Sequence, residues 1–180
     1  MYLKRLSILL SFWALSNGCS EPAPAPTPLQ LTIDASASTP CIAQGNCEEA
    51  CNSASGQACF EIAMSRAQSS GALFDPSKRD KLNQGSEFPR ALELLKSECN
   101  ADNLVSCYLA GQLCYMGLGG YLDQLCALSS FEKSCLGGVI QSCTQLGKIY
   151  ETGRFIAPDQ QRASRYLKAA CDAGDASACR

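Results

Sequence analysis

The sequence predicts an all-α fold in which α/α hairpins stack into a solenoid cross-linked by disulfides. Eight cysteines form four pairs with the spacing C-x7-C, namely Cys51/Cys59, Cys99/Cys107, Cys135/Cys143 and Cys171/Cys179. The last three pairs follow one another at intervals of 36 residues. A fixed period of that length is typical of stacked helix-turn-helix units. Each repeat therefore carries a pair of thiols eight residues apart, close enough to bridge one tight turn.

The clearest copy of the repeat runs from Cys143 to Cys179. Its first helix is predicted to end at Gly153, and Pro158 with Asp159 opens the second, where Asp159 suits an N-cap or a first-turn position. Each helix has apolar residues at helical spacing. These are Leu146, Ile149 and Tyr150 in the first helix, and Ala163, Tyr166, Leu167 and Ala170 in the second.

The preceding copy, 107–143, keeps the same frame, and Gly111 lies at the position of Gly147. Glycine inside a helix costs roughly 1 kcal/mol relative to alanine. Its recurrence at one repeat position predicts a close contact between helices there.

The first copy, 59–107, is twelve residues longer than the others. The surplus falls within 69–87, between helices expected at about 57–69 and 86–99. We expect this insertion to project as a loop from one edge of the array. It holds Phe74 and the charged run 78–81. Most such runs are simply solvated loops; the alternative is a binding element, for which this segment is the best-placed candidate because the other repeats lack it.

These motifs resemble the Sel-one-like (Sel1-like) repeat family, which is related to tetratricopeptide repeats. The resemblance rests on LG-x-x-Y in the first helix, a glycine stop, Asp at the next start and A-x-x-Y-L-x-A-A-C in the second helix. The C-x7-C junctions resemble its secreted cysteine-rich bacterial (Hcp-type) branch. The resemblance covers about 41–180, with repeats at about 51–98, 99–134, 135–170 and a partial unit at 171–180. It implies right-handed stacking and a protein-interaction role. Members of the branch are also linked to β-lactam binding or weak hydrolysis.

The junction cysteines are predicted to form disulfides, because one ends a helix and its partner begins the next across a tight turn. For a ring of nine residues, loop closure predicts roughly 2.5 kcal/mol per bridge. Cys114 and Cys126 occupy facing positions of one hairpin, so we predict a bridge between them. Elimination leaves Cys41–Cys47, although Cys47 and Cys51 could exchange roles.

Residues 1–18 read as an export signal, with Lys4 and Arg5 before an apolar core at 6–15. Cys19 follows in a sequence that resembles the bacterial lipobox, although Ser16 stands where leucine is usual. We expect Cys19 to be lipidated, which would be the chain's attachment to the membrane; a plain secretory signal is the alternative. Residues 19–40, rich in Pro and Ala, read as a disordered linker. Either signal predicts an exported chain in the bacterial envelope, where disulfides persist.

Composition argues against several classes of function. The chain of 180 residues has a formal net charge of −2, which gives no electrostatic reason to expect nucleic acid as a partner. It contains no histidine, so Ser-His-Asp and Cys-His catalytic sites are excluded. C-x2-4-C zinc knuckles are also missing apart from Cys47-x3-Cys51. Ser130 and Lys133 match S-x-x-K without its companion motifs. We therefore predict no catalytic residue, metal site or cofactor.

Two classes of function remain. The first is a non-enzymatic scaffold that binds a protein or peptide, tethered to the membrane through its N-terminal lipid or secreted. The second is a β-lactam-binding or weakly β-lactam-hydrolysing protein. A purely structural envelope lipoprotein is a third reading. A solenoid end normally carries a polar cap. The last helix expected here is left partly uncovered, so self-association at the C-terminal end is a further expectation.

Overall fold

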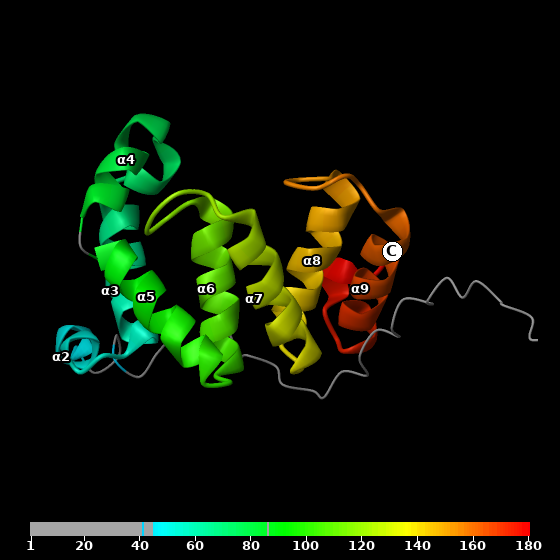
Figure 1. Ribbon diagram of the computed structural model, residues 1–180, viewed down its shortest axis with the longest axis horizontal. Helices are drawn as coiled ribbons and strands as arrows, with labels where there is room; N and C mark the ends of the chain where they lie inside the picture. Colours follow the sequence, from blue (N-terminus) through cyan, green and yellow to red (C-terminus); the bar gives the residue numbers. More distant parts are fainter. Residues whose placement is uncertain (1–40, 42–44, 86) are drawn as a thin grey trace, which may run out of the picture.

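The computed structural model describes residues 41, 45–85 and 87–180, and these residues form helices without any β-strand. The helices of the hairpins stand side by side in one row, and two short helices near the start of the array lie outside that row (Figure 1). The α-helices are α2 (Cys47–Asn52), α3 (Gly56–Ser69), α4 (Pro76–Gln84), α5 (Glu87–Asn100), α6 (Leu104–Met116), α7 (Gln124–Leu136), α8 (Ile140–Thr152) and α9 (Gln160–Asp172). Two short 3₁₀ turns are η1 (Ala72–Phe74) and η2 (Ala176–Ala178).

The repeating unit is the hairpin that the cysteine spacing predicted, with α3, α6 and α8 as first helices and α5, α7 and α9 as second helices. Helix α8 ends at Gly153, whose left-handed φ of 69° terminates the helix. Helix α9 begins after Asp159, whose carboxylate accepts a hydrogen bond from the main-chain nitrogen of Arg162 at 2.9 Å. The all-α solenoid fold class is confirmed.

The core lies between the two helices of each hairpin. A Cβ atom on Gly111 would lie 2.8 Å from the ring of Phe131, and one on Gly147 would lie 2.5 Å from Leu167. The expected close contact is therefore present. The neighbour is chiefly a side chain of the second helix.

The junctions between repeats share one backbone device. The residue five before the second cysteine of each C-x7-C pair has a positive φ of 66° to 104°, and these residues are Ala54, Asp102, Gly138 and Gly174. The reversal brings the Cα atoms of the paired cysteines to 4.6–4.9 Å. Two junctions make this turn without glycine at that position, so the sequence signal for it was incomplete.

The insertion in the first hairpin is not the plain loop that we expected. It contains η1 and α4, and α4 lies at the same edge as the α6–α7 and α8–α9 connections (Figure 1). Asn83 of α4 donates from Nδ2 to the carbonyl oxygens of Gly117 and Gly120, at 2.8 and 2.9 Å. Its Oδ1 accepts from the nitrogen of Gly119 at 2.9 Å. The extra segment thus braces the connection of the next hairpin.

None of the described helices is both long enough and apolar enough to cross a membrane. The predicted signal at 1–18, the linker at 19–40 and the lipidated Cys19 lie outside the described residues.

Candidate functional site

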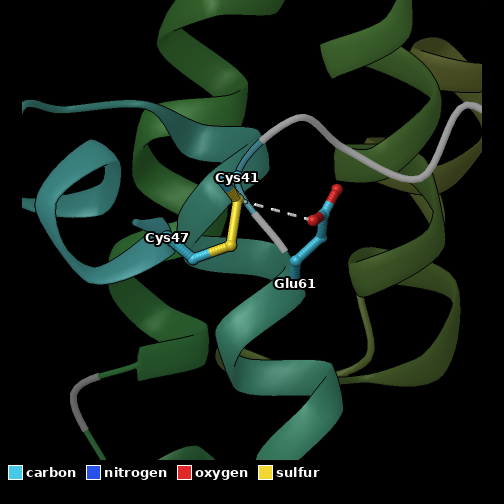
Figure 2. A group of neighbouring side chains, drawn as sticks. All are labelled: Cys41, Cys47 and Glu61. Carbon is cyan, nitrogen blue, oxygen red and sulfur yellow. Dashed lines mark hydrogen bonds between the residues drawn. A yellow bond between two sulfur atoms is a disulfide. The ribbon is translucent and has the colours of Figure 1, made fainter. Parts of the chain in front are cut away.

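The structure brings together the cysteine pairs that the spacing predicted. Sulfur atoms lie at bonding distance in Cys51–Cys59, Cys99–Cys107, Cys135–Cys143, Cys171–Cys179, Cys114–Cys126 and Cys41–Cys47. Cys47 therefore pairs with Cys41 in this arrangement, and Cys51 with Cys59. Both sulfurs beside Glu61 are in a disulfide (Figure 2). They offer no thiolate to a metal ion while that bridge is closed.

The S-x-x-K sequence does not form a reactive pair. Ser130 is buried on α7. The ammonium group of Lys133 lies 2.7 Å from the carboxylate of Asp102 and donates to the carbonyl oxygen of Cys99 at 2.7 Å. Its hydrogen bond and charge hold the pKa of Asp102 below its usual range. Lys133 thus links α7 to the preceding junction. A catalytic lysine would instead have to lie beside the serine hydroxyl.

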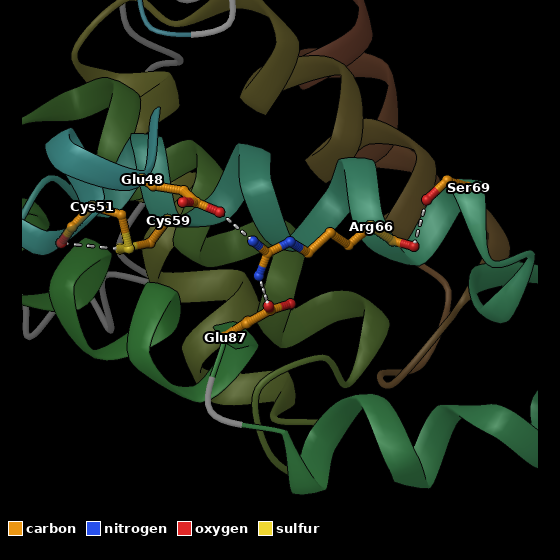
Figure 3. A network of polar contacts seen from close by, with 6 residues as sticks. All are labelled: Glu48, Cys51, Cys59, Arg66, Ser69 and Glu87. Carbon is orange, nitrogen blue, oxygen red and sulfur yellow. Dashed lines mark hydrogen bonds and ion pairs between the residues drawn. A yellow bond between two sulfur atoms is a disulfide. The ribbon is translucent and has the colours of Figure 1, made fainter. Parts of the chain in front are cut away.

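The strongest charged cluster lies at the N-terminal end of the array. The guanidinium group of Arg66 on α3 lies between the carboxylates of Glu48 on α2 and Glu87 on α5 (Figure 3). Its contact with Glu48 measures 2.6 Å. A cavity of about 220 Å³ adjoins these groups and the Cys51–Cys59 bridge. Because the cation already has two carboxylate partners, we interpret this cluster as a clasp between three helices.

A second charged surface lies at α9, where self-association was expected. Its apolar residues Ala163 and Leu167 are buried within the hairpin. A groove of about 540 Å³ beside them is bordered by polar side chains such as Ser164 and Lys168, and Arg180 pairs there with Glu151. The groove is thus lined by apolar and polar side chains together, which does not identify what it binds, and self-association stays a prediction.

The connection between α6 and α7 carries the largest apolar exposure among the described residues. Tyr121 is 96% exposed, Leu122 is 48% exposed and Leu125 is 74% exposed. We call these three side chains the apolar tip. Leu136, which is also exposed, lies at the other end of α7. Clustered exposed apolar side chains of this kind mark interaction sites more often than scattered ones do.

A disulfide and several hydrogen bonds anchor the backbone that carries the apolar tip. Cys114–Cys126 joins α6 to α7 directly beneath it, and Asn83 holds the connection with the three hydrogen bonds described above. Asp123 caps α7 by accepting a hydrogen bond from the nitrogen of Cys126 at 2.9 Å. The exposed side chains are thus presented on a backbone anchored from two neighbouring elements.

The stretch of sequence that carries the apolar tip is almost free of charge. Between Asn103 and Phe131, the one charged residue is Asp123. Interface cores are depleted of charged residues and enriched in Tyr and other aromatics. Sequence reasoning missed this surface, although the long run without charges was a signal that could have located it.

Comparison with known proteins finds similar sequences and similar structures. No protein-family model matches the chain. A curated relative, the cytochrome c oxidase assembly factor 7 of Xenopus tropicalis, is 34% identical over 99 residues, which are 51% of this chain and 43% of that protein. The chain thus spans less than half the length of that relative.

Two solved structures are similar in fold. A Sel1 repeat protein from Oxalobacter formigenes has a TM-score of 0.54 at 18% identity, covering 77% of this chain and 54% of that chain. The cysteine-rich protein B of Helicobacter pylori has a TM-score of 0.48 at 19% identity, covering 67% of this chain and 92% of that one. The first of these shows that the hairpins stack as Sel1 repeats do.

Proposed function

We propose that this protein is a non-enzymatic scaffold that binds another protein through the apolar tip of the α6–α7 hairpin. The observation that carries the proposal is the exposure of Tyr121 on the connection and of Leu125 in the first turn of α7, both beside contacts made by a disulfide and by Asn83. A backbone that is already held in place loses little conformational entropy on binding. Tyr is also enriched among the residues that dominate binding energy.

The proposed setting is an oxidising compartment outside the cytoplasm. Six disulfides in a chain of this size are typical of exported proteins. An export signal at 1–18, a lipid on Cys19 and a linker at 19–40 would deliver and tether the repeats in a bacterial envelope. The cysteine-rich Hcp-type branch remains the proposed placement within the Sel1-like proteins. The name of the curated relative, an assembly factor, agrees with a role in binding other proteins.

The β-lactam alternative has no comparable support. The burial of Ser130 and the engagement of Lys133 with Asp102 leave the S-x-x-K sequence without an open nucleophile. Incubation with a chromogenic β-lactam tests this directly. Turnover that disappears in Ser130→Ala would contradict the scaffold-only proposal.

The interaction itself is tested by site-specific photo-crosslinking in the native envelope. A photoreactive residue in place of Tyr121 is expected to trap a defined protein, because that side chain is almost fully exposed. The same residue in place of Glu93, an exposed position of α5, is the matched control. The additional change Leu125→Ser should abolish the crosslink at 121 if the apolar tip is the contact. Equal crosslinking at 93 and 121, or persistence after Leu125→Ser, would argue against this surface.

A further inference from the structure

The bridge Cys41–Cys47 differs from the junction bridges in what lies against its sulfur. In each C-x7-C pair the second sulfur contacts a main-chain carbonyl oxygen at 3.5–3.7 Å; these oxygens belong to Cys51, Cys99, Cys135 and Asp175. The sulfur of Cys41 instead lies 3.7 Å from Oε2 of Glu61 (Figure 2). A carbonyl oxygen cannot give or take a proton at ordinary pH, whereas a carboxyl group can.

The two sulfurs of this bridge also differ in access. Cys41 is buried, with 8% of its surface exposed, whereas Cys47 at the start of α2 is partly exposed. A cavity of about 320 Å³ adjoins both residues and Glu61. An incoming thiolate must reach one sulfur while the other leaves. Cys47 is therefore the accessible target of the incoming thiolate. Cys41, next to the carboxyl group of Glu61, is the leaving group.

The bridge lies outside the repeated frame. It precedes the first C-x7-C pair, so it closes no junction between hairpins. Its opening would leave the four junction bridges and Cys114–Cys126 in place. A reversible reaction at this site is therefore compatible with a folded array.

We propose that Cys41–Cys47 is a thiol–disulfide exchange site that oxidises a dithiol of a partner protein, with Glu61 as the group that exchanges a proton with Cys41. This activity goes beyond the proposed scaffold role and does not depend on it.

The exchange balances in two displacements. A thiolate of the partner attacks Sγ of Cys47, a mixed disulfide forms, the bond between Cys41 and Cys47 breaks, and Cys41 leaves as a thiolate that takes a proton from the Glu61 carboxyl group. The second thiolate of the partner then attacks the partner's own sulfur in the mixed disulfide and releases Cys47 as a thiolate, which takes a proton from water. The partner is oxidised by two electrons, and the bridge is reduced to two thiols.

The surroundings of Glu61 suit this role. Burial raises the pKa of the carboxyl group above its ordinary value, and the hydrogen bond from Gln57 opposes that shift. A carboxyl group with a raised pKa is a better source of a proton near neutral pH. The other charged groups at the same cavity are Glu48 and Arg66, and these two pair with each other.

The first experiment measures the opening of each bridge in the oxidised full chain under native conditions. Reduced glutathione is the probe, free thiols are alkylated at successive times, and mass spectrometry identifies them. We expect Cys41–Cys47 to open at least about tenfold faster than the other bridges, with glutathione attached to Cys47. Simultaneous opening of all bridges, or glutathione attached to Cys41, would overturn the proposal.

A second experiment separates proton exchange from simple fraying of this end of the chain. Glu61→Gln should slow the opening by about tenfold if the carboxyl group supplies the proton. Glu49→Gln, at an exposed acid of α2, is the matched control and should leave the rate unchanged. Fraying would open the bridge equally fast in all three proteins, and an unchanged rate in Glu61→Gln would refute the assigned role.

The direction of attack has its own test in the single variants. The thiol left in Cys41→Ser is Cys47, which should form a mixed disulfide with oxidised glutathione. The buried thiol left in Cys47→Ser should not. Circular dichroism identifies a variant that has lost its fold. For such a variant, the measurements on the wild-type chain decide the direction of attack. Equal glutathionylation of two folded variants would count against the assignment.

Discussion

Hairpins α6–α7 and α8–α9 are closed at the same repeat position by different chemistry. Seven residues after the second junction cysteine stands Cys114 in the first of these hairpins and Tyr150 in the second. The facing position, nine residues before the next junction cysteine, holds Cys126 and Arg162. A disulfide joins the first pair. In the second, Arg162 donates to the Tyr150 hydroxyl at 3.2 Å and its guanidinium lies 5.3 Å from the ring.

In the hairpin α3–α5, a third kind of contact links the two helices. The corresponding positions hold Arg66 and Arg90, and Arg66 is joined to α5 through Glu87. The repeat therefore requires some link at this position, and the sequence can supply it as an ion pair, a covalent bond or a cation–aromatic contact. The covalent form is found beneath the apolar tip.

The α6–α7 and α8–α9 connections share an unusual backbone conformation at one position and differ in packing. Gly119 and Phe155 occupy equivalent positions and have φ values of 86° and 77°. A Cβ on Gly119 would lie 2.7 Å from the carbonyl oxygen of Phe88. Phe155 tolerates this unusual conformation for a bulky residue because its ring packs on Tyr115, with centroids 5.3 Å apart, and Arg154 covers Tyr115 at 4.3 Å.

The largest difference is expected from removal of the covalent link. Cys114→Ala/Cys126→Ala should lower the free energy of unfolding by about 3 kcal/mol, since a ring of thirteen residues is released in the unfolded chain. Tyr150→Phe removes the hydroxyl that accepts a hydrogen bond from Arg162 and donates one to Glu132, and should cost about 1 to 2 kcal/mol. Urea denaturation measures both. Equal losses would show that the two links are energetically interchangeable.

Gly119→Ala should destabilise the fold by about 2 to 3 kcal/mol. The new methyl group would overlap the main chain of Phe88 and would also occupy a positive-φ conformation. Gly120→Ala is the control, because no atom lies within 4 Å of its added Cβ. Thermal denaturation distinguishes them. A similar midpoint for both variants would mean that α5 and the connection can separate without cost.

Asn83→Ala should cost about 2 kcal/mol and loosen the α6–α7 connection specifically. It removes three hydrogen bonds to main-chain groups of that connection. Hydrogen exchange should rise at Gly119 and stay unchanged in the α8–α9 connection. Gln84→Ala, at the exposed end of α4, serves as the reference. Unchanged exchange at Gly119 would show that the disulfide alone holds the apolar tip.

Arg154→Ala should have the smallest effect, about 1 kcal/mol, because its contact with Tyr115 is an exposed cation–aromatic pair. The loss should be confined to the α8–α9 connection and should be visible in the chemical shifts of the Phe155 ring. Arg154→Lys retains the charge and should lose less. A change at the apolar tip would indicate that the two connections are coupled.

Periodicity could predict the hairpins and their ends because both depend on nearby residues. The stop at Gly153 and the start at Asp159 follow from the preferences of single residues at helix ends. The insertion at 69–87 was located correctly from its length. Its helix α4 was missed, because a polar segment without an apolar stripe has no helical signature in the sequence.

The sequence by itself determined the repeat, the number of hairpins, the fold class and the regular cysteine spacing, since these are written in intervals along the chain. Tertiary structure decided what each irregular residue touches. Asn83 meets groups 34 to 37 residues away, and Glu61 meets Cys41 across twenty residues. These contacts join elements that stack only after the chain has folded, and no period along the sequence encodes them. The apolar tip and the proposed exchange site both depend on contacts of that kind.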